Sequence, residues 1–370
     1  MKRFLKQKRN LICLCWPVGF LCYILAKCNS DIAEYVFARG IYRVYGFIMS
    51  FLTGFLPFSV AEWLLILFVL ALAVYPVISV IRIVRSKEKL YTVLDSLRLL
   101  IMALGIVFLW FMIGAGTNYY RYEFAKFSGL EVKKSTVDEL YGLCEELVEK
   151  TNEARAGLSI GDDEIFVSSM TNRERASICR DAMDKLSEQY DVLEGFYPYA
   201  KPVLFSRAMS EFNIVGVYFP WTVESNINTD VPDYSKASTT CHELSHLRGF
   251  MREDEANYIG YLACVNSDSA ELKYSGYMLA LIISMNKLYD ADKDKYFTLR
   301  SKYNDGVNLD LINNSEYWEQ FEDTVLSTAG ETMNNTYLKV NSVEDGTKSY
   351  GRMVDLLLAE RRKRLAGQNS

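Results

Sequence analysis

Two histidines, the only two in the 370 residues, lie four positions apart at His242 and His246, and Glu243 directly follows the first. On an α-helix, residues i and i+4 share a face, so both imidazoles can point at one atom. Glu243 then lies about 100° round the helix from His242, close enough to hold a water molecule on that atom. In this His-Glu-x-x-His pattern the histidines bind zinc and the glutamate is the general base of a metallopeptidase.

A catalytic zinc ion has three protein ligands and one open position for water. Since the chain has no third histidine, the third ligand must be Asp, Glu or Cys. Arg252 stands where variants with three histidines have their last ligand, and an arginine cannot bind a cation. The next residue, Glu253, can. Glu255 is the alternative ligand, and a third reading has neither acid bind, because acids favour the first turn of any helix.

The helices that must position these residues are marked by local signals. Asp233 or Ser235 can cap a helix that carries both histidines. Gly249, three residues after His246, stands where a glycine commonly ends a helix, and it permits a tight reversal of the chain. The next helix is expected from Glu253 to about Asn266, which returns Glu253 towards the histidines.

The rest of the second part of the chain reads as mainly helical with a few strands, an α+β fold. A polar stretch that includes Glu224, Asn226 and Asn228 follows a strand at 216–220, which could pair with an extended substrate. Those three side chains either face the cleft or form an ordinary polar loop. Further strands and helices are expected at 202–206 (strand), 136–152, 172–190, 275–289, 315–327 and 350–364 (helices).

The first 116 residues or so are strongly apolar. They predict a membrane domain, 1–116, with three transmembrane helices at about 11–27, 60–82 and 97–115 and an interfacial loop at 31–58. Residues 117–370 form the second domain. A cleaved signal peptide is the other reading of the first apolar run. The spans show no buried cluster of ionisable groups, which argues against a transport role.

Basic residues crowd 1–10 and 82–98, so the positive-inside rule places the N-terminus in the cytoplasm and the second domain on the outer side. The net charge of −5 argues against nucleic acid as a partner. The eight cysteines form no Cys-x-x-Cys pair. Disulfides among Cys144, Cys179, Cys241 and Cys264 are left open, with buried free thiols as the alternative.

The chain resembles an uncharacterised bacterial family of membrane proteins, classed by a domain of unknown function. The resemblance rests on the segments 216–228, 241–250, 252–258 and 349–359, and on 56–59 before the second span. Members of that family resemble zincin metallopeptidases attached to three N-terminal spans. Glu253 and Asn257 also resemble the Glu-x-x-x-Asp pattern of gluzincin metallopeptidases, in which the glutamate binds zinc and the later acid supports a ligating histidine. Asn257 departs from that acid and adds no charge.

These observations predict a bacterial multi-pass membrane protein whose zincin-like outer domain hydrolyses peptide bonds with a zinc-activated water. His242, His246 and Glu253 would hold Zn²⁺, Glu243 would be the base, and Asn257 would orient a histidine. Candidates for stabilising the oxyanion are Tyr258, Tyr350 and Arg352. The alternative is a catalytically inactive zinc-binding sensor or scaffold in the membrane. The sequence names neither the peptide or protein substrate nor the oligomeric state.

Overall fold

The protein is described here by a computed structural model that covers residues 8–341 and 352–368. The chain is mainly helical, with one small sheet. Its internal contacts divide it into two compact units. The first unit is Met1–Tyr122 together with Phe219–Val223, and the second unit is Glu123–Tyr218 together with Glu224–Ser370.

The first unit contains three helical stretches long and apolar enough to cross a membrane: Lys8–Cys28, Val60–Arg85 and Lys89–Gly114. Each contains most of a predicted span, although the third begins eight residues before the predicted residue 97. The segment at 31–58, predicted as an interfacial loop, is mostly helical, with one helix at Ile32–Tyr42 and another at Arg43–Gly54. The elements of this unit are η1 (Lys8–Leu14), α2 (Cys15–Cys28), the π-helical η2 (Ile32–Tyr42), α3 (Arg43–Gly54), α4 (Val60–Arg85), α5 (Lys89–Gly114) and η3 (Gly116–Tyr120).

The expectation that the spans carry no buried ionisable cluster is wrong. Asp95 and Arg98, both buried in α5, form an ion pair with each other. Arg9 and Arg82 also reach Asp95, at 2.5 Å and 3.3 Å. The cluster lies within the first three turns of α5 and near the last turn of α4, where long basic side chains can extend towards headgroups. It therefore joins three helices at one end of the spans.

Several helices of the second unit begin at a capping residue, but the helix that carries the histidines has no side-chain cap, so the prediction that Asp233 or Ser235 caps it is wrong. Thr136 and Glu139 form a complete capping box at the start of α7 (Val137–Arg155), the helix predicted at 136–152, and Thr171 with Glu174 does the same for α8 (Asn172–Ser187). The helices are α6 (Phe124–Ser128), α7 (Val137–Arg155), α8 (Asn172–Ser187), η4 (Asp191–Leu193), α9 (Ser206–Glu211), α10 (Asp233–His246), α11 (Glu253–Val265), α12 (Ala270–Ala291), α13 (Lys293–Arg300), α14 (Asp305–Glu319), α15 (Val325–Val340) and α16 (Met353–Gln368).

Two predicted elements differ from the structure. The helix expected at 315–327 is wrong: α14 ends at Glu319, and a new helix, α15, begins after Thr324, whose side chain caps it. The strand expected at 202–206 is also wrong in extent, because β1 contains only Lys201–Pro202 and Ser206 already begins α9.

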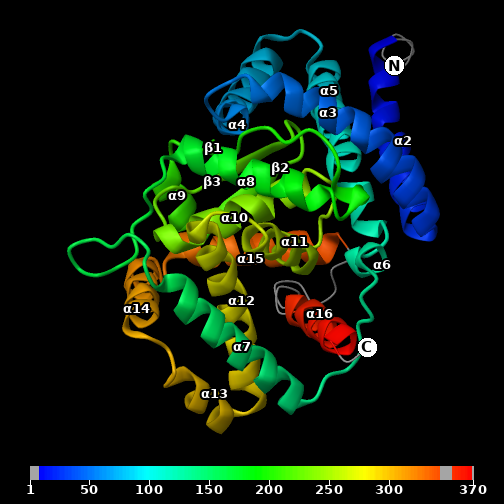
Figure 1. The fold of residues 1–370 in the computed structure, drawn as a ribbon. Helices are drawn as coiled ribbons and strands as arrows, with labels where there is room; N and C mark the ends of the chain where they lie inside the picture. The colour runs from blue at the N-terminus through cyan, green and yellow to red at the C-terminus, as the bar shows by residue number, and fades with distance from the viewer. Residues whose placement is uncertain (1–7, 342–351, 369–370) are drawn as a thin grey trace. The chain divides into compact units, whose positions relative to one another are not determined.

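A three-stranded sheet lies beside the helix that carries the histidines. Its strand order is β1–β3–β2, where β2 is Gly216–Phe219 and β3 is Glu224–Ile227. β1 runs parallel to β3, with Lys201 opposite Asn226. The expected strand at 216–220 is therefore present, and β2 is an edge strand. Figure 1 shows α8 and α10 along the sheet, with α11 and α12 packed against α10.

α10 is buried along most of its length because the sheet and three helices surround it. α11 approaches it closely at Gly260. A Cβ atom at that position would lie only 2.9 Å from the backbone nitrogen of His242. The absence of a side chain at position 260 thus sets the distance between the helix with the histidines and the helix that begins with Glu253.

Candidate metal centre

His242 and His246 lie one helical turn apart on α10 and point at the same place. Their Nε2 atoms are 3.1 Å apart, and their rings meet edge to face with centroids separated by 4.8 Å. Both side chains are buried. The i, i+4 spacing therefore gives the convergence that the sequence predicts.

Both rings are held by acceptors on their other nitrogen. Nδ1 of His242 lies 2.7 Å from Oδ1 of Asn257 on α11, and Nδ1 of His246 lies 2.7 Å from the carbonyl oxygen of Phe250. An acceptor at Nδ1 places the imidazole proton there and leaves the Nε2 lone pair free to bind a cation. The two Nε2 atoms are thus prepared as ligands.

Glu253, the first residue of α11, completes a triangle with the histidines. Its Oε2 lies 3.1 Å from Nε2 of His242 and 4.0 Å from Nε2 of His246. One ligand atom from each of the three residues lies within 4.8 Å of the others, and all three side chains are buried. Gly249, at a φ of +82°, makes the reversal that brings the start of α11 back to α10.

Glu255, the alternative third ligand, lies elsewhere. Its Oε1 accepts a hydrogen bond of 2.7 Å from the backbone N–H of Phe124 and lies 3.7 Å from Nη1 of Arg252. The cluster of candidate metal ligands contains Glu253 and not Glu255. Glu253 and Glu255 are two positions apart on α11, and residues two apart on a helix point to different faces.

Glu243 lies at the edge of this cluster. Its Oε1 is 4.0 Å from Nε2 of His242, and the backbone N–H of Tyr218 on β2 donates a hydrogen bond to the carboxylate. Gly216 on the same strand leaves the space that the Glu243 side chain occupies, because a Cβ there would lie 2.7 Å from Oε1. Oε2 is buried and has no hydrogen-bond partner within the described residues.

Burial governs the charges of the cluster. It raises the pKa of the Glu243 carboxyl to about 8 and lowers the pKa of His246 to about 4. Burial also disfavours the charged form of His242, but the hydrogen bond with Glu253 and the nearby carboxylates outweigh it and raise its pKa to about 9. The two glutamates therefore favour a positive charge next to them, and a cation bound at Nε2 of His242 would take the place of the proton that they otherwise hold there.

Two imidazole nitrogens and one carboxylate oxygen, all buried and converging, are the ligand set of catalytic zinc sites with an open fourth position. No sulfur joins them: the structure has Cys144, Cys179, Cys241 and Cys264 as buried free thiols. The thiol of Cys241 contacts those of Cys179 and Cys264 instead. The residues present therefore fit a zinc ion.

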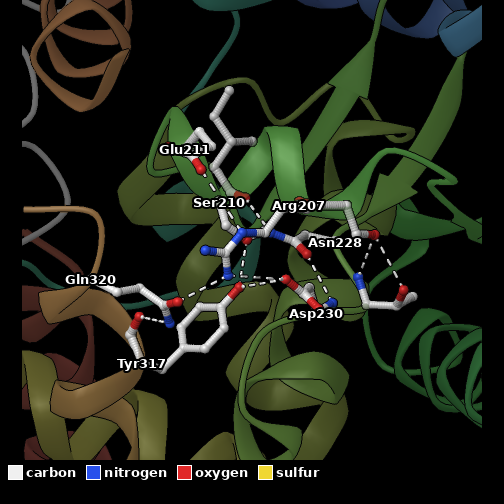
Figure 2. Close-up of polar contacts among 10 residues, drawn as sticks. Arg207, Ser210, Glu211, Asn228, Asp230, Tyr317 and Gln320 are labelled. Carbon is white, nitrogen blue, oxygen red and sulfur yellow. Dashed lines mark hydrogen bonds and ion pairs between the residues drawn. The ribbon is translucent and has the colours of Figure 1, made fainter. Parts of the chain in front are cut away.

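Of the three polar residues predicted after β2, Glu224 is buried in β3, and the two asparagines make hydrogen bonds with residues outside this cluster. The side-chain amide of Asn228 is fully buried and donates to Ser210 Oγ and to the carbonyl of Ile214, as part of the network with Tyr317 and Asp230 in Figure 2. Asn226 donates to the carbonyls of Val217 and Glu224 within the sheet. Both asparagines stabilise loops and strands.

Two of the three candidates for stabilising the oxyanion, Tyr258 and Arg352, contact acidic side chains in the structure. The hydroxyl of Tyr258 contacts Glu360. Arg352 has its Nε 3.4 Å from Oδ2 of Asp254, the residue after Glu253. Tyr350 lies outside the described residues.

Sequence reasoning missed two contributors. The ring of Tyr218 lies against His246, with centroids 5.8 Å apart, while its backbone N–H binds Glu243. Phe250 contributes only its carbonyl oxygen. The strand that contains Tyr218 was predicted. A contact through a backbone N–H or carbonyl cannot be predicted from the residue type, because nearly every residue carries these groups.

Comparisons with known proteins assign no activity. No curated protein matches the chain, and no solved structure does. A protein-family comparison does match, over residues 37–358, which include α3, α4 and α5 of the first unit and the candidate metal centre but not the first apolar stretch, Lys8–Cys28. The chain therefore belongs to a family described as proteins of unknown function, DUF3810.

Proposed function

We propose that the second unit is a zinc-dependent peptidase with a zincin-like arrangement of the gluzincin type. One observation carries the proposal: His242, His246 and Glu253 place three ligand atoms within 4.8 Å of one another, and Glu243 lies beside them. A structural zinc site has four protein ligands, whereas this cluster offers three. The free fourth position favours catalysis over a purely structural metal.

The residues divide the chemistry among them. A zinc ion bound here would lower the pKa of a water molecule and polarise the scissile carbonyl. Glu243 takes the proton of the attacking water and passes it to the leaving amine. Burial raises the pKa of the Glu243 carboxyl, and a raised proton affinity suits a group that must take up a proton and then pass it on. Asn257 and the Phe250 carbonyl keep the imidazoles oriented.

A peptide is the substrate class that the surroundings favour. β2 is an edge strand, and its residues Gly216 and Tyr218 contact Glu243. Extended peptides bind proteins by adding to such edges through main-chain hydrogen bonds. A chain aligned along β2 would therefore pass beside the proposed base.

The three apolar helices indicate association with a membrane. The proposal adds an orientation, with the N-terminus in the cytoplasm and the second unit outside, from the basic residues near the chain start and after α4. Cysteines introduced at the exposed positions Asp162 and Lys87 test it, in a chain whose exposed native Cys28 is replaced by serine. A membrane-impermeant thiol reagent applied to intact cells should label the first and spare the second; the reverse pattern would refute the orientation.

A peptide-library cleavage assay on the purified full chain tests the proposed activity. Cleavage should occur with zinc bound, disappear after a chelator removes zinc, and return when zinc is added back. A protein that binds zinc yet cleaves no peptide would contradict the peptidase proposal. That outcome would favour the alternative, a zinc-binding sensor or scaffold.

A further inference from the structure

The turn between β2 and β3 is part of the first unit, although both strands flank the metal-centre helix of the second. The hydroxyl of Tyr45 on α3 lies 2.8 Å from the carbonyl oxygen of Pro220 and 3.0 Å from that of Trp221. Trp110 on α5 donates its indole N–H to the same hydroxyl at 2.7 Å. Two helices of the first unit therefore hold the backbone of this turn through one tyrosine.

α5 also contacts the turn directly. The indole N–H of Trp221 donates to the carbonyl of Val107 at 3.2 Å. A Cβ atom at Gly114 would lie 2.3 Å from the carbonyl oxygen of Pro220, so only glycine allows the observed approach of the two backbones. The turn is thus fixed by side-chain hydrogen bonds and by backbone packing.

The turn is strained. Val223 has a φ of +52°, a region that a β-branched residue rarely adopts, and its side chain is fully buried. The N–H groups of Thr222 and Val223 both donate to the carbonyl of Phe219. Strain of this kind persists only where the surroundings fix the backbone, and it is found where a protein positions functional groups.

The same short strand contacts the metal centre. Tyr218, whose N–H binds Glu243 and whose ring lies against His246, is the residue immediately before Phe219. Gly216 lies against the Glu243 side chain two residues earlier. An extended strand advances only about 3.3 Å per residue and has little freedom, so a shift of the turn moves the Tyr218 N–H with it.

We propose that the first unit positions the base Glu243 through the turn 219–223, with Tyr45 as the positioning residue. The membrane helices would thereby set the activity of the metal centre without touching substrate or metal. The effect of Tyr45 on catalysis rests on the peptidase proposal, because Glu243 acts only in turnover. The effect of Tyr45 on the position of β2 does not rest on that proposal.

Tyr45→Phe tests the link, with Tyr75→Phe as the matched control. Tyr75 also donates its hydroxyl to a backbone carbonyl of the first unit, but that carbonyl belongs to Ser96 on α5 and not to the turn. We expect hydrogen exchange of the Tyr218 amide to rise about five-fold in Tyr45→Phe, the effect of losing one ordinary hydrogen bond. The turnover number for peptide should fall with zinc content unchanged, and Tyr75→Phe should alter neither.

Trp110→Phe provides a second variant, since it removes the other hydrogen bond to the Tyr45 hydroxyl and keeps an aromatic ring. Equal exchange at Tyr218 in wild type, Tyr45→Phe and Trp110→Phe would overturn the proposal. So would exchange that rises to the same extent in Tyr75→Phe. Faster exchange at Tyr218 in a protein that cleaves no peptide would support the link and refute the peptidase proposal, so the two failures are distinguishable.

Discussion

Nδ1 of His246 lies 2.7 Å from the carbonyl oxygen of Phe250, which the chain reaches by reversing at Gly249. The segment that follows α10 thus supplies, four residues after His246, the acceptor that orients its imidazole. Because the φ of Gly249 is +82°, an alanine there costs about 1–2 kcal/mol of folding free energy or forces the turn to change.

We therefore predict that Gly249→Ala weakens zinc binding, measured by competition with a chelator, by about ten-fold, the lower end of the losses seen when a partner of a metal-binding histidine is disturbed. Gly157→Ala is the matched control. Gly157 has the same φ of +82° and no atom within 4 Å of a new Cβ, so the strain should be similar. Unchanged zinc affinity in Gly249→Ala, or an equal loss in Gly157→Ala, would refute this role of the turn.

Asn257 should matter through His242 alone. Removing its side-chain oxygen in Asn257→Ala should weaken zinc binding by about 10–100-fold, because the imidazole loses its orientation. Asn257→Asp keeps an acceptor at the same place and should bind zinc at least as tightly as wild type. Comparable weakening by both substitutions would show that packing, and not the hydrogen bond, is what the position provides.

The chemical core of the site could be predicted from sequence because it depends on local geometry. The i, i+4 spacing places both imidazoles on one face, Gly249 marks the reversal, and the first acid of the next helix returns to the histidines. Glu253 followed from its place at the start of the next helix, with Glu255 as the alternative, and the role of Asn257 followed from the resemblance to the gluzincin pattern. Contacts between residues a few positions apart on a helix can be predicted from the sequence, because the helix fixes which side chains share a face.

Long-range contacts could not be predicted. Tyr45 and Pro220 are separated by 175 positions, and their contact is to a backbone carbonyl that every residue carries. Asp95 was missed because it precedes the predicted start of the third span at 97. The break between α14 and α15 has neither Gly nor Pro: Asp323 makes it with a φ of +54°, which aspartate tolerates better than most residues.

The stability of the second unit should depend on Asp310, far from the metal centre in sequence. This buried carboxylate lies 2.7 Å from Nε of Arg155 and accepts from the Phe166 N–H and the Tyr274 hydroxyl. Asp310→Ala leaves the Arg155 charge buried without its partner, which costs about 3–5 kcal/mol. Thermal unfolding followed by circular dichroism should show a Tm lower by about 10 °C.

Asp305→Ala is the control for that measurement, since Asp305 is an exposed acid on the same helix, α14. Its Tm should fall by a few degrees at most, in keeping with the loss of about 0.3–1 kcal/mol expected for an exposed acid in a first helical turn. A Tm of Asp310→Ala equal to that of Asp305→Ala would show that the buried network contributes nothing to folding.

Glu243→Gln separates turnover from metal binding. Glutamine keeps the size of the side chain and can still accept from the Tyr218 N–H, but it cannot take a proton from water. Peptide cleavage should fall by at least about 100-fold, the usual contribution of a general base, with zinc content unchanged. Hydrolysis at the wild-type rate in this variant would remove Glu243 from the mechanism.

The most direct test of the central claim is the zinc content of the purified full chain after unbound metal is removed, measured by elemental mass spectrometry. Wild type and Glu255→Gln should retain about one zinc ion per chain, as expected for a single site with three protein ligands, while His242→Ala and Glu253→Gln retain far less. A wild-type chain that holds no zinc, or a Glu253→Gln chain that holds as much as wild type, would contradict the account.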